Sequence, residues 1–151
     1  MLVKLETLEQ VYPLSKDDPV RPHLPADWRL MHGREVYALY EDQYAEAAPV
    51  MFEGPRAVIC VAYTKGVGLT EKDLNNTDDP DTAMFYTVWS YDKGAGREIV
   101  NAVQRHIKKT RDDIVRFMTL SPLTEMAEKF HLRNGAKFFR KGSLCQNFEY
   151  S

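Results

Sequence analysis

A buried strand followed by a glycine-containing turn and a helix is the feature that most constrains the fold of this chain. Residues 82–89 read TAMFYTVW, a run of β-branched and aromatic residues that predicts a core strand. The pattern breaks at 90–96, and aliphatic residues from Ile99 to Ile107 then recur at helical spacing before a basic cluster. A strand, turn and helix in this order are typical of a fold in which helices cover a sheet.

Other segments extend this pattern along the chain. Further strands are predicted at Glu35–Tyr40, Ala57–Thr64, Ile114–Leu120, Ala136–Arg140 and Leu144–Tyr150. A short helix is predicted at Glu71–Leu74, and a second one carries Leu123, Met126, Ala127 and Phe130 on one face and ends near Asn134. Strands that alternate with helices before a terminal hairpin predict an α/β or α+β fold with helices packed on a sheet.

The N-terminal third has a different character. Leu2, Leu5 and Leu8 have helical spacing, and four prolines between 13 and 25 then predict an extended arm, residues 1–33, that lies on the core. The stretch from Pro49 to Pro55 predicts a turn region. With 151 residues, we expect one domain over 1–151.

Composition excludes several classes of protein. Apolar residues make up 44% and charged residues 28%, as in ordinary globular proteins, and the net charge of −2 offers no field for collecting nucleic acid. No apolar run reaches the roughly 20 residues of a membrane helix, and acids within the first ten residues argue against a leader peptide. We therefore expect no nucleic-acid or membrane partner and a cytoplasmic location.

The two cysteines, Cys60 and Cys145, lie far apart in apolar, strand-like runs. Their separation is unlike that of metal ligands, so no metal site is predicted. We interpret both as buried free thiols, with a disulfide as the less favoured alternative.

The turn before the main helix is the first candidate binding site. Gly94 and Gly96 would let a phosphate group approach the backbone at the helix N-terminus. Glycine is also common in such turns merely for its conformational range, and that interpretation is favoured on the turn alone. The chain has neither the phosphate-binding loop of ATP-dependent enzymes nor the glycine pattern of dinucleotide folds, which argues against ATP and NAD.

Two further positions are candidates for chemistry. His131 lies near the edge of the apolar face of the short helix, where its imidazole could reach a groove between helix and sheet, although a structural role is the commoner one. Ser121 precedes Pro122 and is most simply interpreted as a helix N-cap. His23, His32 and His106 are predicted to lie on the surface.

A resemblance to a known family joins these positions. The stretch from about Arg34 to Tyr150 resembles the catalytic domain of malonyl-CoA decarboxylase, a member of the GNAT acyltransferase superfamily. The matching pieces, in the family's order, are AVICVAYTKG at 57–66, DTAMFYTV at 81–88, TLSP at 119–122, FHLRNGA at 130–136 and NFEY at 147–150. The chain looks like a compact form without the family's N-terminal helical domain.

The resemblance implies a GNAT-like sheet, mixed and mostly antiparallel. Coenzyme A would lie between two splayed central strands, here 82–89 and 114–120, with its pyrophosphate at the glycine turn. The implied contacts are Phe85, Tyr86, Thr87, Val88, Gly94, Ala95, Gly96 and Arg97. The acyl-CoA thioester is then the substrate, and neither a metal nor another cofactor is implied.

The same resemblance assigns the catalytic residues. Ser121 and His131 would form the catalytic pair, with Tyr150 nearby. Only nine residues separate Ser121 from His131, where the family has a long helical insertion. One straight helix over 122–131 would hold the two Cα atoms about 15 Å apart. Either the helix begins later, near Thr124, or the two residues act separately.

Three functions follow from these observations. The first is decarboxylation of malonyl-CoA or a related thioester. The second is N-acetyl transfer from acetyl-CoA to an amine, with His131, Glu98 or Glu125 as the base and an acceptor pocket lined by the arm and residues Asp27–Tyr40. The aromatic residues there, Trp28, Tyr37 and Tyr40, are compatible with such a pocket, although a role in the core is the favoured interpretation. The third is a non-catalytic acyl-CoA binder. An exposed edge predicted at 144–150 would also allow a homodimer.

Overall fold

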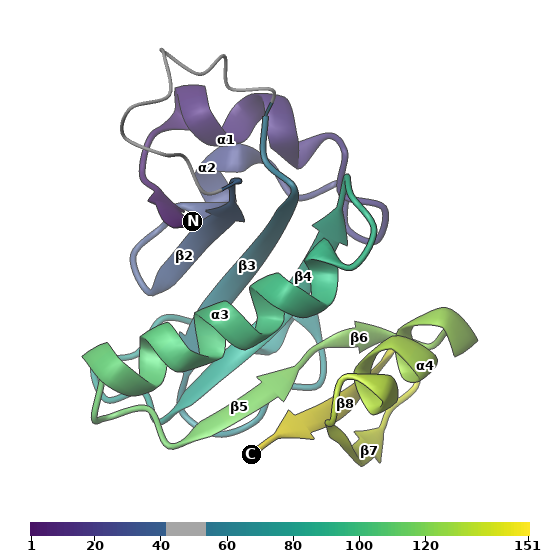
Figure 1. Ribbon diagram of the computed structural model, residues 1–151. Helices are drawn as coiled ribbons and strands as arrows, with labels where there is room; N and C mark the ends of the chain where they lie inside the picture. The colour runs from purple at the N-terminus through teal and green to yellow at the C-terminus, as the bar shows by residue number, and fades with distance from the viewer. Residues whose placement is uncertain (42–53) are drawn as a thin grey trace.

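The computed structural model describes residues 1–41 and 54–151 and is organised around one eight-stranded sheet (Figure 1). The strands are β1 (Leu2–Leu5), β2 (Arg34–Leu39), β3 (Ala57–Thr64), β4 (Thr82–Ser90), β5 (Arg116–Thr119), β6 (Ser121–Pro122), β7 (Lys137–Lys141) and β8 (Cys145–Tyr150). The helices are α1 (Leu8–Ser15), α2 (Ala26–Arg29), the 3-10 turn η1 (Glu71–Asp73), α3 (Ala95–Thr110) and α4 (Glu125–Arg133). Among the described strands, β4 and β5 pair in parallel and all other pairs are antiparallel.

Each face of the sheet has its own core. Helix α3 crosses one face, where Ile99, Val103 and Ile107 are fully buried, and α1 and α2 lie toward the opposite face (Figure 1). Strand β3 is buried at all eight positions because it is covered on both sides. This explains its continuous apolar sequence, which is typical of a central strand.

The segment 116–122 is one strand with respect to β8. Phe117 pairs with Tyr150 and Ser121 pairs with Gln146 in a single unbroken register. On its other side this β5–β6 strand pairs with β4 only as far as Thr119. It therefore leaves β4 while it stays on β8.

Strand β4 carries an irregularity at the same level. Its pairing with β3 joins Cys60 to Thr87 and Val61 to Phe85, so Tyr86 is an extra residue on β4. Such a β-bulge bends a strand and redirects its side chains, and bulges are frequent beside active sites.

Three expectations from the sequence are wrong. Residues 2–5 form a strand, and the first helix begins only at Leu8, where Thr7 caps it. Ser121 lies in a strand, and the N-cap of α4 is Thr124, whose Oγ1 accepts the Ala127 amide at 3.2 Å. Helix α4 therefore starts late, the first of the two alternatives that the nine-residue spacing left open.

The third error concerns the edge of the sheet. The segment 144–150 is not an edge, because β8 lies between the β5–β6 strand and β7. The exposed strand of the terminal hairpin is β7. The homodimer argument from 144–150 is lost with it. The turn region predicted at 49–55 falls mostly outside the described residues.

Most other expectations are confirmed. The predicted strand Ala57–Thr64 and the helix at 99–107 are present, Glu71–Asp73 is a 3-10 turn, and Cys60 and Cys145 are free and buried. The N-terminal segment contains the regular elements β1, α1 and α2, and its residues Leu5, Val11, Leu24 and Ala26 belong to the buried cluster on the face of the sheet opposite α3.

Candidate active site

The candidate site lies where β4 and the β5–β6 strand separate. The Leu120 amide still donates to the Phe85 carbonyl at 2.9 Å, close to the end of the parallel pairing. Beyond this point β4 runs on to Ser90 without that neighbour. Backbone groups that face the gap need other partners, since buried N–H and C=O groups are almost always paired.

A cavity of about 620 Å³ occupies this gap. Residues 85–90 of β4, 120–122 of the β5–β6 strand and part of α4 line it, together with Gly96 and Val100 of α3. The arm adds Asp17, Pro19 and Val20, so one carboxylate lies in the lining. No lysine or arginine is among its lining residues in the described part of the chain. An apolar cavity of this volume with a few polar groups is typical of a small-molecule site.

The glycine turn opens α3 beside the cavity. Gly94 is the N-cap and has a left-handed φ of 83°, a conformation that favours glycine, and no side chain caps the helix. The described hydrogen bonds leave the amides of Gly96 and Arg97 without an acceptor. The acids Asp92 and Glu98 beside this turn are both paired with Arg56, at 3.0 and 2.9 Å. The helix terminus is thus suited to an anion.

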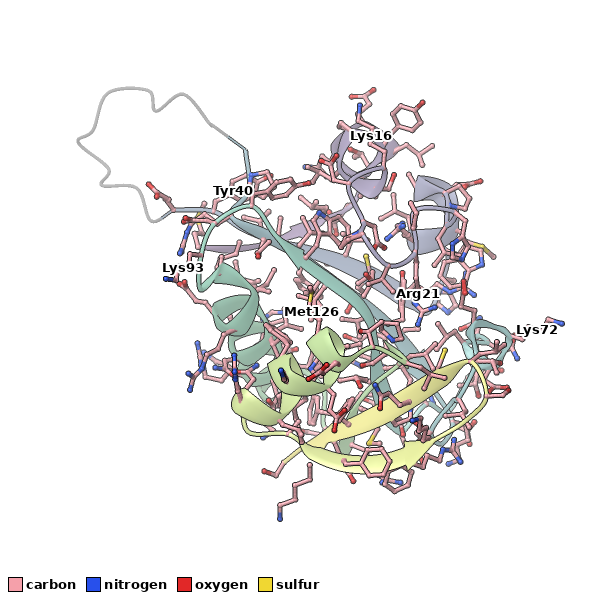
Figure 2. All side chains as sticks on the ribbon, turned by 90° about the vertical axis from the view of Figure 1, so that its right-hand side faces the viewer. Lys16, Arg21, Tyr40, Lys72, Lys93 and Met126 are labelled. Carbon is pink, nitrogen blue, oxygen red and sulfur yellow. The ribbon has the colours of Figure 1, made fainter. Side chains whose placement is uncertain are left out.

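Gly96 also has a packing role. A Cβ at this position would lie 3.3 Å from the ring of Phe130, which is tighter than ordinary van der Waals contact. Glycine therefore lets Phe130 of α4 pack against the first turn of α3. Figure 2 shows α4, labelled at Met126, in front of α3.

His131 and Tyr150 form a buried pair. The Nδ1 atom of His131 lies 2.7 Å from the Tyr150 hydroxyl, and the Asn134 amide donates to the same hydroxyl at 3.3 Å. The imidazole stacks on Phe148, with 5.5 Å between ring centroids. His131 lines the cavity although it is only 6% exposed.

Burial also controls the protonation of this pair. Desolvation lowers the pKa of His131 to about 4, because a charged imidazolium is costly in an apolar site. Desolvation raises the pKa of Tyr150 to about 12, and the Asn134 hydrogen bond opposes that rise. Both side chains are therefore neutral near pH 7.

Ser121 lines the same cavity but does not touch the histidine pair through any described hydrogen bond. Its hydroxyl donates to Thr119 Oγ1 at 2.8 Å, and the same oxygen accepts the Phe148 amide at 3.0 Å. Ser121 and His131 thus face one cavity as separate groups, each with its own partner.

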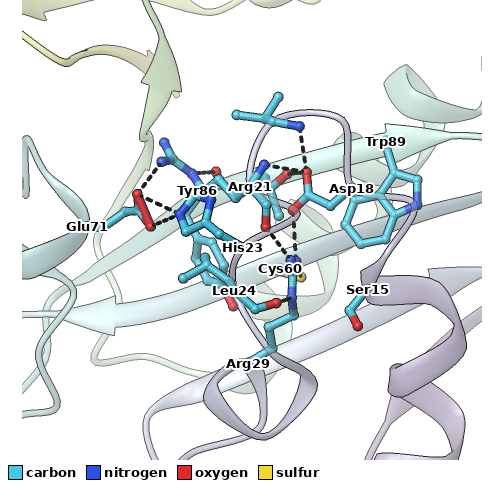
Figure 3. A network of polar contacts seen from close by, with 12 residues as sticks. Ser15, Asp18, Arg21, His23, Leu24, Arg29, Cys60, Glu71, Tyr86 and Trp89 are labelled. Carbon is cyan, nitrogen blue, oxygen red and sulfur yellow. Dashed lines mark hydrogen bonds and ion pairs between the residues drawn. The ribbon is translucent and has the colours of Figure 1, made fainter.

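A polar network that the sequence analysis missed lies on the arm side of the gap (Figure 3). Arg21 donates to the carbonyl oxygens of Tyr86 on β4 and of Leu120 on the β5–β6 strand, at 2.8 and 2.9 Å. It therefore bridges the two strands at the point where they part. Glu71 holds the other side of the guanidinium at 3.2 Å.

A buried ion pair supports this bridge. Arg29 and Asp18 are both fully buried and lie 2.9 Å apart. Asp18 also accepts the Thr87 hydroxyl at 2.8 Å and the Arg21 amide at 3.0 Å. Three charged residues of the proline-rich arm, Asp18, Arg21 and Arg29, are the only sequence signal of this network, and they resemble ordinary surface charges.

No protein-family model matches the sequence, and no curated protein matches it. Malonyl-CoA decarboxylase from Rhodopseudomonas palustris superposes with a TM-score of 0.71 at 16% identity, over 100% of this chain and 56% of that one. The chain thus spans about half the length of that structure.

Two other solved structures align over nearly the whole chain. The GNAT domain of S. lividans PAT has a TM-score of 0.62 at 14% identity, over 99% of this chain and 88% of that one. Arabidopsis thaliana NAA60 in complex with acetyl-CoA has a TM-score of 0.65 at 12% identity, over 99% and 97%. The fold is the GNAT fold. The mixed, mostly antiparallel sheet that the family resemblance implies is confirmed.

Within this GNAT fold, the predicted site residues divide into two groups. The residues that line the cavity are Phe85, Tyr86, Thr87, Val88, Gly96, Ser121 and His131. Gly94, Ala95 and Arg97 adjoin it at the start of α3, and Tyr150 reaches it through His131. The structure brings these positions to one place in the GNAT fold, and their roles in binding or catalysis stay predictions.

The residues suggested for an amine acceptor lie elsewhere. Glu98 pairs with Arg56 and Glu125 pairs with Lys129, and neither lines the cavity. Tyr37 is 3% exposed in the core below α3, and Trp28 packs edge-on against Tyr86.

Among the described residues, no cluster of His, Cys, Asp and Glu side chains could hold a metal ion. No helix there is long and apolar enough to cross a membrane.

Proposed function

We propose that the protein decarboxylates a malonyl-type CoA thioester in the cavity between β4 and the β5–β6 strand. One observation carries the proposal: a neutral, buried histidine faces a cavity whose described lining contains no cation. GNAT-fold neighbours in complex with acetyl-CoA or CoA support an acyl-CoA ligand. Decarboxylation then needs no second substrate.

The lack of a cationic partner favours loss of carbon dioxide. A β-carboxylate in an apolar cavity loses hydration without gaining an ion pair, whereas the enolate formed from it spreads its charge toward the thioester oxygen. The carbon–carbon bond breaks, its electron pair forms the enolate, and carbon dioxide leaves. A proton then adds to the α-carbon and yields acetyl-CoA.

The side chains of the cavity have distinct roles in this proposal. His131 offers its Nε2 edge to the thioester oxygen or to the α-carbon during protonation. Ser121 orients the carboxylate through its hydroxyl. When Ser121 turns its hydrogen toward the substrate, Thr119 can donate in return, because hydroxyl pairs rotate freely.

The glycine turn would hold the other end of the ligand. The free amides of Gly96 and Arg97 and the dipole of α3 suit the pyrophosphate of CoA. The pantetheine arm would follow β4, where the missing neighbour leaves backbone groups to pair with it.

Mass spectrometry of the CoA species tests the proposal. The protein is incubated with malonyl-CoA, and we expect conversion to acetyl-CoA that His131→Ala abolishes without loss of CoA binding. His106→Ala, on α3 away from the cavity, is the matched control and should convert normally. Unchanged malonyl-CoA, or a fully active His131→Ala variant, would refute the decarboxylase proposal.

N-acetyl transfer is the second candidate. It is supported by the alignment with NAA60 over nearly the whole of both chains. Acetyl-CoA consumption that depends on an added amine, together with stable malonyl-CoA, would favour transfer. The displaced positions of Glu98 and Glu125 leave His131 as the candidate base for that reaction.

A further inference from the structure

Asn134 is a buried polar residue that the proposed mechanism leaves without a role. It follows α4 directly as the C-cap and is 9% exposed. Its Nδ2 donates to the Tyr150 hydroxyl at 3.3 Å, while its Oδ1 is buried and has no hydrogen-bond partner. The bond to Tyr150 is therefore the one described hydrogen bond of this side chain.

The hydrogen bonds of Tyr150 link this amide to His131. A phenol has one hydrogen to donate, and the Tyr150 oxygen already accepts from Asn134. The Asn134 NH2 group cannot accept a hydrogen bond, so among the described partners the hydroxyl hydrogen can go only to Nδ1 of His131, at 2.7 Å. Nδ1 must then be the unprotonated nitrogen, and the ring proton is on Nε2.

The position of Nε2 follows from burial. Among the described residues, the buried side-chain nitrogen and oxygen atoms without a partner are Tyr86 Oη and Asn134 Oδ1. His131 Nε2 has no hydrogen bond and is not one of them, so it is accessible. Because His131 lines the cavity, Nε2 faces the space that a substrate would occupy.

We propose that Asn134 is a positioning residue that acts through Tyr150 to hold His131 as the tautomer with its proton on Nε2, facing the cavity. If the Asn134 amide turned over, Oδ1 would accept the Tyr150 hydrogen and Nδ1 of His131 would have to donate to Tyr150. The cavity would then meet a bare Nε2 lone pair. One amide thus decides whether the imidazole offers a hydrogen-bond donor or an acceptor to the ligand.

The tautomer of His131 also bears on the proposed function, and its expected effect on the rate rests on that function. A thioester oxygen that gains negative charge needs a donor, and an Nε2–H group supplies one without a charged imidazolium. An amine nucleophile would instead need the bare nitrogen as a base. The tautomer therefore favours decarboxylation over transfer.

Nitrogen NMR of protein labelled at histidine measures the tautomer directly. At pH 7.5, we expect the wild-type His131 signals to show a protonated Nε2 and a bare Nδ1. Asn134→Asp places an acceptor at both side-chain oxygens, so Tyr150 should donate to residue 134 and the proton of His131 should move to Nδ1. The same tautomer in wild type and Asn134→Asp, or a wild-type proton on Nδ1, would overturn the proposal.

Controls separate this effect from damage to the fold. Asn101→Asp makes the same change on α3 outside the cavity and should leave the His131 signals unchanged. If Asn134→Asp does not fold, Tyr150→Phe serves instead: it removes the link, so both tautomers should be populated. A Tyr150→Phe spectrum identical to that of wild type would also refute the proposal.

Kinetics give a second, separable result. We expect Asn134→Asp to lower kcat for malonyl-CoA at least about tenfold with little change in KM, since general acid–base and donor effects of this kind are large. A moved proton without any decarboxylase activity in wild type would leave the tautomer assignment intact and reject the proposed reaction.

Discussion

Two polar clusters lie on the two sides of the separation between β4 and the β5–β6 strand, and they differ in how completely their hydrogen bonds are satisfied. On the arm side, Asp18, Arg21 and Arg29 all have charged partners as well as backbone partners. On the α4 side, His131 Nε2 and Asn134 Oδ1 have no partner among the described residues, and of the two only Nε2 is accessible from the cavity. A satisfied buried cluster stabilises a fold, whereas an unsatisfied and accessible group beside a cavity is available to a ligand.

Removal of one charge from the arm cluster should have the largest effect. Arg29→Met leaves the Asp18 carboxylate buried without its cation, and we expect about 3–5 kcal/mol of lost stability in urea denaturation. Arg29→Met combined with Asp18→Asn should recover part of that loss, because the amide keeps an acceptor for Thr87. A loss below about 1 kcal/mol for the single variant would mean that the cluster is not structural.

The α4 cluster should make the stability of the protein depend on pH through His131. The pKa of His131 is lowered to about 4 in the folded protein, so the unfolded chain binds a proton first as pH falls below about 6.5. The contribution of neutral His131 to the free energy of unfolding is therefore fully present above pH 6.5, and it is lost as the pH falls from 6.5 to about 4.

Between pH 6.5 and 4, the free energy of unfolding should fall by up to about 3 kcal/mol, at 1.36 kcal/mol per pH unit. Urea unfolding of wild type and His131→Leu at several pH values measures it as the difference between the two curves. Parallel curves between pH 4 and 6.5 would show that the imidazole is not desolvated.

The sequence predicts part of the fold and of the α4 cluster, but it does not predict the arm cluster. The strands β3 and β4 and the helix α3 follow from apolar patterns, and the positions of Ser121, His131 and Tyr150 follow from a family resemblance. The arm cluster could not, because no local pattern indicates that Arg21 reaches carbonyls at 86 and 120, and the choice of partner is made only by the tertiary fold.

The errors have physical causes as well. Leucines at 2, 5 and 8 share a helical spacing, but backbone pairing with β2 holds residues 2–5 as a strand. Ser121 before Pro122 resembles a cap, but pairing with β8 extends the strand through both, and Thr124 caps the helix instead. In both cases, long-range strand pairing overrode a local signal.

Charge at the glycine turn offers a milder test. Gly94→Asp places a carboxylate where the pyrophosphate would lie, and we expect CoA affinity to fall about tenfold, or about 1.4 kcal/mol, in calorimetry. Gly94→Asn is the matched control, because asparagine tolerates the left-handed backbone without the charge. Equal affinities for the two variants would show that no phosphate binds at this turn.

The smallest effect is expected for Ser121→Ala. The Ser121 hydroxyl makes one described hydrogen bond, to Thr119 Oγ1. Without it, Thr119 Oγ1 still accepts the Phe148 amide, so the free energy of unfolding should change by less than about 1 kcal/mol. Decarboxylation should nevertheless slow, which would place Ser121 among the ligand-facing groups. Loss of stability without loss of rate would place it with the structural cluster.

The β5–β6 strand keeps one register with β8 while it separates from β4, so the sheet is divided into two parts at this point. One part is β4 with α3 packed on it, and the other is β8 with α4 and β7. The two parts are joined where β4 pairs with the β5–β6 strand, as far as Leu120. A long ligand bound between the two parts would contact both of them and restrict their motion relative to each other. Amide hydrogen exchange in the terminal hairpin, far from the ligand itself, should therefore slow when the gap is filled.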